Sequence, residues 1–225
     1  YGHEQIKEHL QNAIRLNKVS HAYIFNGPMG SGKKMTAGIF AETLQCERHG
    51  QEPCGTCHSC IQSESGNQPD IIWVHHEKPG SIGVDDVREQ VIGDMKIKPY
   101  SSRYKIYIDE AEKLTQQAQN ALLKTIEEPP AYGIIILLTT NADTFLQTIL
   151  SRCVRLDFRP LRDTLVTQYL QEKYDLTDYE CRFATAFAQG KIGRAVTIAT
   201  SKEFAQLKDC LLYTSPSPRD RTRSR

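Results

Sequence analysis

The feature that most constrains this chain is a glycine-rich loop between an apolar run and a helical stretch. The segment Gly27-Pro-Met-Gly-Ser-Gly-Lys-Lys34 follows Ala22-Tyr-Ile-Phe25 and precedes a predicted helix over 33–44. Glycines let the backbone curl so that several N–H groups point inward, and the helix N-terminus adds positive potential. This order predicts a phosphate-binding loop, whose lysine reaches the β- and γ-phosphates. The candidate phosphate-binding residues are Gly27, Gly30, Gly32, Lys33 and Lys34.

The last position of this motif departs from the usual pattern. A Ser or Thr there supplies a hydroxyl that binds Mg²⁺, but this chain has Lys34. An ammonium group cannot coordinate a metal cation and repels it. Thr36 lies about 200° around the helix from Lys34, so it is no simple substitute. We therefore expect phosphate binding, while Mg-dependent hydrolysis stays open because a water molecule could fill the ligand position.

Short apolar runs alternate with helical patterns along most of the chain. Further predicted strands are Ile71–Val74, Lys105–Ile108 and Ile134–Thr139, and the clearest helix runs from about Gln116 to Glu127 before two prolines. Nearly unbroken apolar strands suit a parallel sheet that is covered on both faces. The predicted fold class is therefore α/β, with right-handed βαβ crossovers and a nucleotide-binding architecture.

Two acidic residues follow the third predicted strand. Asp109 and Glu110 would lie at the carboxyl edge of the sheet, where open α/β sheets place their ligands. Asp109 could hold Mg²⁺ through water, and Glu110 could orient or deprotonate an attacking water. The alternative is a strand end followed by an acidic helix cap. After the fourth strand, Thr140 and Asn141 are placed where a polar side chain could sense the γ-phosphate, although alone they would be an ordinary turn.

Four cysteines with metal-ligand spacing lie between the first predicted helix and the second strand. They are Cys46, Cys54, Cys57 and Cys60, in a segment rich in Gly, Pro and Ser. Four thiolates at short spacing can surround one tetrahedral Zn²⁺, whereas the cytosolic redox state disfavours disulfides. We expect a structural zinc without an open coordination position. His49 and His58 are competing ligands by sequence proximity, but a complete cysteine set places them at the surface.

Composition and charge narrow the class of protein. The chain has 225 residues, of which 39% are hydrophobic and 24% charged, and its longest apolar run is too short to cross a bilayer. Residues 1–210 carry 24 basic and 26 acidic groups once the four arginines and one aspartate of 211–225 are removed from totals of 28 and 27. Because the apolar runs are short and no basic-then-apolar signal segment opens the chain, we expect a cytoplasmic protein. The near-neutral body does not indicate strong DNA binding by the chain alone.

The expected organisation has three parts. Residues 1–160 form the nucleotide-binding-type domain, and 161–210 form a small lid of three helices, predicted over 162–171, 179–189 and 192–199. Residues 211–225 contain two prolines and no apolar periodicity, so we expect a disordered or foreign tail. A basic nucleic-acid-binding arm is the alternative for that tail. The chain begins at Tyr1, which indicates processing or a fragment.

Together these motifs resemble the clamp-loader subunits of the AAA+ ATPases, and especially bacterial DNA polymerase III subunits of delta-prime type. The resemblance covers residues 1–200. Its further motifs are Gly2-His-Glu4, His21-Ala-Tyr23, Asn120-Ala-Leu-Leu-Lys-Thr-Ile-Glu-Glu-Pro-Pro130 and Ser151-Arg-Cys153. It implies an AAA+ P-loop NTPase fold with a zinc-binding insertion and a helical lid, without the collar domain of that family.

The resemblance also implies roles that spacing alone does not give. Arg152 would be an arginine finger inserted in trans into the ATP site of a neighbouring motor subunit, and Arg194 a second nucleotide-sensing arginine. The implied partners are gamma/tau and delta subunits, with the sliding clamp and primer–template DNA reached through the complex and no membrane. Polymerisation, a nucleotidyltransferase reaction, belongs to another subunit of the holoenzyme.

Three functions stay distinguishable. Lys34 favours a degenerate, delta-prime-like subunit that is largely stationary and supplies the finger during clamp loading in DNA replication. The alternative is an active Mg-ATP-hydrolysing motor of gamma/tau type that uses Lys33, Asp109 and Glu110. An isolated DNA-binding ATPase such as a helicase would show tight, salt-dependent DNA affinity, and the near-neutral body disfavours it.

Overall fold

The computed structural model describes residues 2–75, 82–100, 103–174 and 176–201. The chain divides into two compact units, Gly2–Arg159 and a second that begins at Pro160. The tail expected over 211–225 lies outside the described residues.

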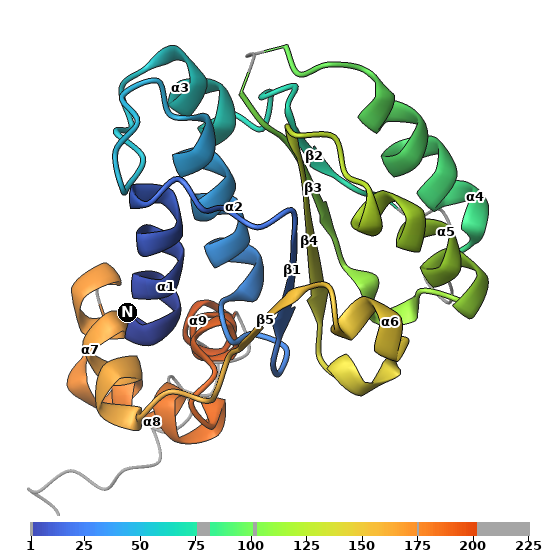
Figure 1. Cartoon of the computed structure of the whole chain (residues 1–225). Helices are drawn as coiled ribbons and strands as arrows, with labels where there is room; N and C mark the ends of the chain where they lie inside the picture. The colour runs from blue at the N-terminus through green and yellow to red at the C-terminus, as the bar shows by residue number, and fades with distance from the viewer. Residues whose placement is uncertain (1, 76–81, 101–102, 175, 202–225) are drawn as a thin grey trace, which may run out of the picture. The chain divides into compact units, whose positions relative to one another are not determined.

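The first unit is built on a parallel sheet of five strands in the order β2-β3-β4-β1-β5 (Figure 1). Tyr23 of β1 lies opposite Ile136 of β4 on one side and Val154 of β5 on the other. Because every pair is parallel, all carboxyl ends lie at one edge of the sheet, which confirms the predicted α/β class. The strands are β1 (Ala22–Asn26), β2 (Ile71–Trp73), β3 (Lys105–Asp109), β4 (Gly133–Thr139) and β5 (Val154–Asp157).

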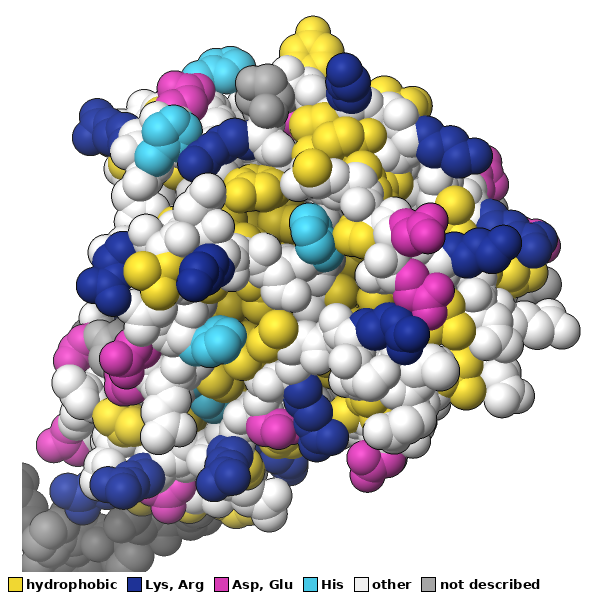
Figure 2. Space-filling model, viewed as in Figure 1, with side chains coloured by type: hydrophobic (Ala, Val, Ile, Leu, Met, Phe, Trp, Pro, Cys, Tyr) yellow, Lys and Arg dark blue, Asp and Glu magenta, His cyan; other side chains and the backbone are white. Residues whose placement is uncertain are grey.

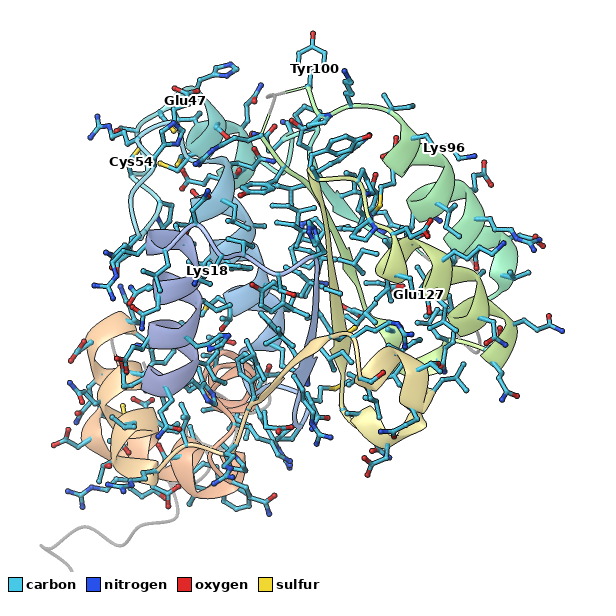
Figure 3. The ribbon with its side chains drawn as sticks, viewed as in Figure 1. Lys18, Glu47, Cys54, Lys96, Tyr100 and Glu127 are labelled. Carbon is cyan, nitrogen blue, oxygen red and sulfur yellow. The ribbon has the colours of Figure 1, made fainter. Side chains whose placement is uncertain are left out.

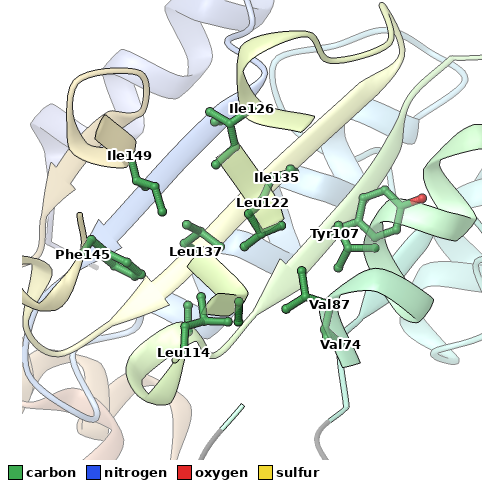
Figure 4. Close-up of a cluster of buried hydrophobic side chains, with 14 of the residues drawn as sticks. Val74, Val87, Tyr107, Leu114, Leu122, Ile126, Ile135, Leu137, Phe145 and Ile149 are labelled. Atoms are coloured by element: carbon green, nitrogen blue, oxygen red, sulfur yellow. The ribbon is translucent and has the colours of Figure 1, made fainter. Parts of the chain in front are cut away.

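Two apolar layers enclose the sheet. Every residue of β3 and β4 is buried, as expected for central strands covered on both faces. Helices α1 (Glu4–Arg15) and α2 (Lys33–Gln45) cover one face, where Leu10 and Phe40 pack against the sheet. Helix α5 (Gln116–Glu127) and its neighbours cover the other face, where Leu122 packs beside Leu137 (Figure 4).

The remaining elements of the first unit are short. Helix α5 has the bounds that its apolar periodicity predicts, because the Thr115 hydroxyl accepts from Ala118 N at its start and Pro129 follows its end. The other elements are α3 (His58–Glu64), α4 (Val84–Val87), η1 (Arg88–Gly93), η2 (Asp94–Lys96), η3 (Ala111–Lys113), η4 (Ala142–Thr144) and α6 (Gln147–Leu150).

Strand β5 was not among the predicted strands. Only Leu156 is buried in it, while Arg155 and Asp157 are exposed and Val154 is half-buried. It pairs with β1 at one edge of the sheet, so it does not need the continuous apolar run of a central strand. Its short, mixed sequence therefore gave no strand signal.

The second unit contains α7 (Asp163–Lys173), α8 (Asp178–Ala188) and α9 (Ile192–Thr200) among its described residues. Their buried residues form a core of their own, which includes Val166, Leu170 and Ala184. The Thr177 hydroxyl and the Glu180 carboxylate form a capping box at the start of α8.

Within the described part of the chain, no helix combines the length and apolar character that crossing a bilayer requires. Basic and acidic side chains are interspersed over the face seen in Figure 2.

Candidate functional site

The glycine-rich loop lies between β1 and α2, at the carboxyl edge of the sheet. Gly27 has φ 154°, and a Cβ at this position would lie 2.3 Å from the carbonyl oxygen of Phe158. Its N–H donates to Thr139 O of β4 at 3.1 Å. Gly30 and Gly32 have φ of 78° and 94°, in the left-handed region that favours glycine. The glycines of the motif are thus required by packing and by backbone conformation.

The Lys33 ammonium closes this loop from inside. Lys33 is only 8% exposed. Its Nζ donates one hydrogen bond to Gly27 O and another, of 3.0 Å, to Pro28 O. Burial lowers the pKa of Lys33, while the charges of Glu112 and Glu110 act in the opposite direction. Lys33 is therefore enclosed by the loop and lies within electrostatic reach of Glu110 and Glu112, which follow β3.

Lys34 makes a contact that its sequence position does not reveal. Its Nζ lies 2.9 Å from Oε1 of Glu110 and 5.3 Å from the centre of the Trp73 ring. The side chains of Lys34 and Glu110 are 67% and 61% exposed, so the pair contributes little to stability. Its chemical consequence is larger, because Glu110 accepts from an ammonium at the place where a base would orient water.

The donor set at residue 34 does not fit Mg²⁺. That ion needs oxygen ligands in near-octahedral geometry, and a lysine ammonium only donates hydrogen bonds. Asp109 is buried at the end of β3, where Leu137 is its neighbour on β4. Glu110 thus reaches the start of α2 and Asp109 precedes it in β3, but residue 34 lacks the hydroxyl that would complete a metal site.

Asn141 lies two residues beyond β4 and is exposed. Its Oδ1 accepts from Asp143 N at 3.0 Å and caps η4, so the structure shows the turn role, while γ-phosphate sensing by Asn141 stays a prediction. Asn26, which the sequence did not single out, bridges three elements at this edge. Its Nδ2 donates to Asp157 Oδ1 at 2.6 Å, and its Oδ1 accepts from Ala142 N at 3.1 Å.

His3 is a second residue that sequence reasoning did not single out. Its Nε2 lies 3.1 Å from Ser31 O in the loop, and its ring centre lies 4.8 Å from that of Phe158. Burial lowers the pKa of His3, which favours the neutral ring. The segment before α1 therefore braces the loop. The only signal in the sequence was the Gly2-His-Glu4 motif of the family resemblance.

The four cysteines meet between α2 and α3. Their Sγ atoms all lie within 4.8 Å of one another, and those of Cys54 and Cys60 are 4.0 Å apart. Tetrahedral Zn²⁺ with Zn–S bonds of about 2.3 Å requires sulfur atoms about 3.8 Å apart, so the cluster fits this ion. His49 and His58 are exposed and stand outside the cluster.

Helix ends and backbone amides position these thiols. Cys46 is the C-cap of α2 and Cys57 the N-cap of α3, so a bound ion would join the two helices. Cys57 N and Cys60 N each donate to a cysteine Sγ at 3.4 Å, as in metal–thiolate sites. Glu47 Oε1 accepts a hydrogen bond from Ser59 N, so it links the segment after α2 to α3. Figure 3 labels Glu47 and Cys54 in this region.

The protonation of the cysteines is uneven without an ion. Hydrogen bonds from the Thr56 backbone and hydroxyl lower the pKa of Cys54 to about 5, whereas burial raises the pKa of Cys60 to about 12. A metal ion would convert the remaining thiols to thiolates and release protons. The chemistry that zinc would supply here is structural, because four sulfur ligands leave no open position.

Arg152 lies after α6, on the exposed surface of the first unit. Its Nη2 is 3.1 Å from Glu127 Oε1, at the end of α5 (Figure 3), and its Nη1 donates to Thr148 O at 2.9 Å. The side chain is 42% exposed. Arg194 is exposed on α9 in the second unit. The contacts of the first unit therefore bring Lys34 and Glu110 together, and place Arg152 against Glu127.

A parallel sheet of this order, with a glycine-rich loop between β1 and α2 and two acids at the end of β3, has the fold of the AAA+ class of P-loop proteins. The chain belongs to the family described as DNA polymerase III, delta subunit, whose model matches residues 2–162.

Several curated proteins are similar to this chain. It is 35% identical to DNA polymerase III subunit tau of Bacillus subtilis, over 95% of this chain and 39% of that protein. It is 37% identical to subunit tau/gamma of Haemophilus influenzae, over 88% and 29% of the two chains. It is 34% identical to subunit delta' of Bacillus subtilis, over 88% and 59%. The chain thus spans less than two thirds of these relatives.

Solved structures show the same fold. A DNA polymerase III gamma subunit-related protein of Thermotoga maritima has a TM-score of 0.50 and 23% identity, over 92% of this chain and 63% of that one. The RuvB Holliday junction branch migration motor of Thermotoga maritima has a TM-score of 0.58 and 15% identity, over 94% and 63%.

Proposed function

We propose that this chain is a clamp-loader subunit of delta-prime type. It turns over little or no ATP itself and supplies Arg152 to the ATP site of a neighbouring motor subunit during loading of the sliding clamp. Its partners are gamma/tau and delta subunits, and it reaches the clamp and primer–template DNA through that complex in the cytoplasm. Family membership supports the clamp-loader assignment, because tau, gamma and delta' subunits are among the similar proteins.

The ion pair between Lys34 and Glu110 is the observation that favours a stationary subunit over an ATP-hydrolysing motor. Hydrolysis needs a metal ion on the phosphates and an oriented water. Lys34 offers no metal ligand, and its ammonium lies 2.9 Å from the carboxylate that would orient water. The Lys34 side chain therefore disfavours both the binding of the metal ion and the orientation of the water.

The position of Arg152 supports its donation to a partner. A half-exposed pair with Glu127 is weak, so the guanidinium can leave that contact at little cost. A guanidinium beside a γ-phosphate offsets charge in the transition state through two parallel hydrogen bonds. Within the described residues, the Arg152 side chain contacts Glu127, Thr148 and Ser151, which are all exposed, so its loss should spare the fold.

The cysteine cluster completes the proposed function with a structural zinc. Cys46, Cys54, Cys57 and Cys60 would hold the ion and join the end of α2 to the start of α3.

Arg194 is proposed as a second nucleotide-sensing residue, and Asn141 as the residue that senses the γ-phosphate.

A motor of gamma/tau type is the second candidate. Asp109 ends β3 and Glu110 follows it at the carboxyl edge of the sheet, and the match to the tau subunit of Bacillus subtilis covers 95% of this chain. On this alternative, Lys34 would release Glu110 when nucleotide binds. ATP turnover by the isolated chain separates the two candidates.

Arg152→Ala in a loader reconstituted with its other subunits tests the proposed donation. Arginine fingers contribute a factor of about 10³ or more in other phosphoryl-transfer enzymes, so single-turnover hydrolysis at the adjacent site should fall by at least about tenfold. Arg155→Ala is the matched control, because Arg155 is equally exposed and pairs with Asp157 on its own strand. Unchanged hydrolysis with Arg152→Ala in an assembled loader would reject the role.

A further inference from the structure

Two lysines at the start of α2 place two ammonium groups beside the phosphate-binding loop. Lys33 is buried and bonded to loop carbonyls, whereas Lys34 is exposed and reaches Glu110 at 2.9 Å. A loop of this kind ordinarily offsets the charge of its ligand with one lysine and one Mg²⁺. Here the residue that would ligate the metal ion is itself a cation.

We propose that this loop binds nucleoside di- and triphosphates in their metal-free form, with the Lys34 ammonium acting as a tethered cation in place of Mg²⁺. The proposal deepens the function proposed above, since it names the ligand form that a non-hydrolysing loop accepts. Lys33 and the loop N–H groups hold the phosphates as in related loops.

The ion pair of Lys34 with Glu110 is weak enough for the Lys34 ammonium to leave Glu110 and bind a phosphate instead. Both side chains are more than 60% exposed, so their ion pair is screened by solvent and costs little to break. Lysine carries its charge on a flexible stem of four carbons, which lets the ammonium move from a carboxylate to a phosphate oxygen. Phosphate is the stronger attraction, because it carries more charge and more acceptor oxygens than Glu110.

A buried hydroxyl in the same loop points to a ligand rather than to a closed structure. Ser31 is 4% exposed, and its Oγ has no hydrogen-bond partner among the described residues. Buried polar groups normally find a partner, and a phosphate oxygen would supply one. The Ser31 carbonyl is already occupied by His3, which fixes this residue within the loop.

Magnesium should weaken this binding rather than strengthen it. A Mg²⁺ ion on the phosphates would bring two positive charges close to the Lys34 ammonium, and like charges repel. Residue 34 would also give the ion no oxygen ligand. Mg²⁺ in solution also binds the nucleotide phosphates, and this lowers the concentration of the metal-free nucleotide that the loop binds.

The test is isothermal titration calorimetry of the whole chain with ATP, and separately with ADP, in EDTA and in excess MgCl₂. Wild-type protein should bind both nucleotides in EDTA, and should bind them more weakly in excess MgCl₂. Lys34→Thr should reverse the preference and bind at least about tenfold tighter with Mg²⁺ than without it. Lys33→Ala should lose binding in both buffers, which places the ligand in the loop. Lys18→Thr, at an exposed position outside the loop, is the matched control and should behave as wild type.

Two results would overturn the proposal. One is wild-type binding that requires Mg²⁺ or tightens with it, and the other is no wild-type binding of ATP or ADP in EDTA. A wild-type chain that binds neither nucleotide would still leave the stationary role intact, because that role needs no ligand. Rapid hydrolysis of Mg-ATP would instead contradict the stationary role, so the two failures are distinguishable.

Discussion

The ammonium of Lys34 lies 2.9 Å from Oε1 of Glu110, although the two residues are 76 positions apart in the chain. Lys34 thus stands where a phosphate-binding loop has a hydroxyl, and it also pairs with the acid proposed to orient water. The contact lies at the carboxyl edge of the sheet, between the start of α2 and the end of β3.

The cysteine cluster predicts about one zinc ion per chain. Cys57→Ser should lose the ion and the order of the segment between α2 and α3, because Cys57 is a proposed ligand and also the N-cap of α3. Cys153→Ala, outside the cluster, should retain the metal. Elemental analysis with circular dichroism measures both effects. A wild-type chain purified without zinc, or full zinc content in Cys57→Ser, would contradict the assignment.

Two glycines on the same strand–loop–helix segment should respond to alanine in opposite ways. Gly27→Ala places a methyl group 2.3 Å from the backbone oxygen of Phe158, so we expect a loss of about 1–3 kcal/mol in the free energy of unfolding. Gly38→Ala meets Trp73 at an ordinary 3.6 Å within α2, and should gain up to about 1 kcal/mol. Urea denaturation of the two variants checks the signs. Equal effects would show that the loop tolerates a side chain at residue 27.

The half-buried ring of His3 predicts a pH-dependent stability. Burial lowers the pKa of His3 below its ordinary 6.5, so the folded state binds fewer protons than the unfolded state near that pH. Its contribution is complete above pH 6.5 and is lost as the pH falls through the lowered value. His3→Asn cannot titrate and tolerates the left-handed φ of 54° at this position. The free energy of unfolding, measured at about pH 7.5 and about pH 5.5, should fall less for His3→Asn than for wild type. An identical fall in both proteins would exclude His3 as the source.

The central sheet was predictable because its strands are continuous apolar runs. Strands β3 and β4 are buried throughout, so their sequences carry an unbroken hydrophobic signal. Strand β5 carries no such signal, since its single buried residue is Leu156 at an edge of the sheet. An edge strand is only partly enclosed, so it needs few apolar residues. Its sequence is then hard to distinguish from that of a turn.

The candidate site was predictable in its parts and not in its contacts. Loop glycines and cysteine spacing are local patterns, and each can be read within about twenty residues. The contacts of Lys34 with Glu110, and of Arg152 with Glu127, join segments that only the folded sheet brings together. Asn26 and His3 were missed for the same reason, because their partners lie far away in the chain.

The most direct test of the stationary role is steady-state ATP hydrolysis by the purified chain with Mg²⁺, compared among wild type, Lys34→Thr and Lys33→Ala. The structure predicts that wild-type turnover does not exceed that of Lys33→Ala, because residue 34 offers no metal ligand and Glu110 is engaged. Lys34→Thr restores the hydroxyl and releases Glu110, so any gain in turnover should appear in that variant. Substantial wild-type hydrolysis that Lys34→Thr leaves unchanged would contradict the account.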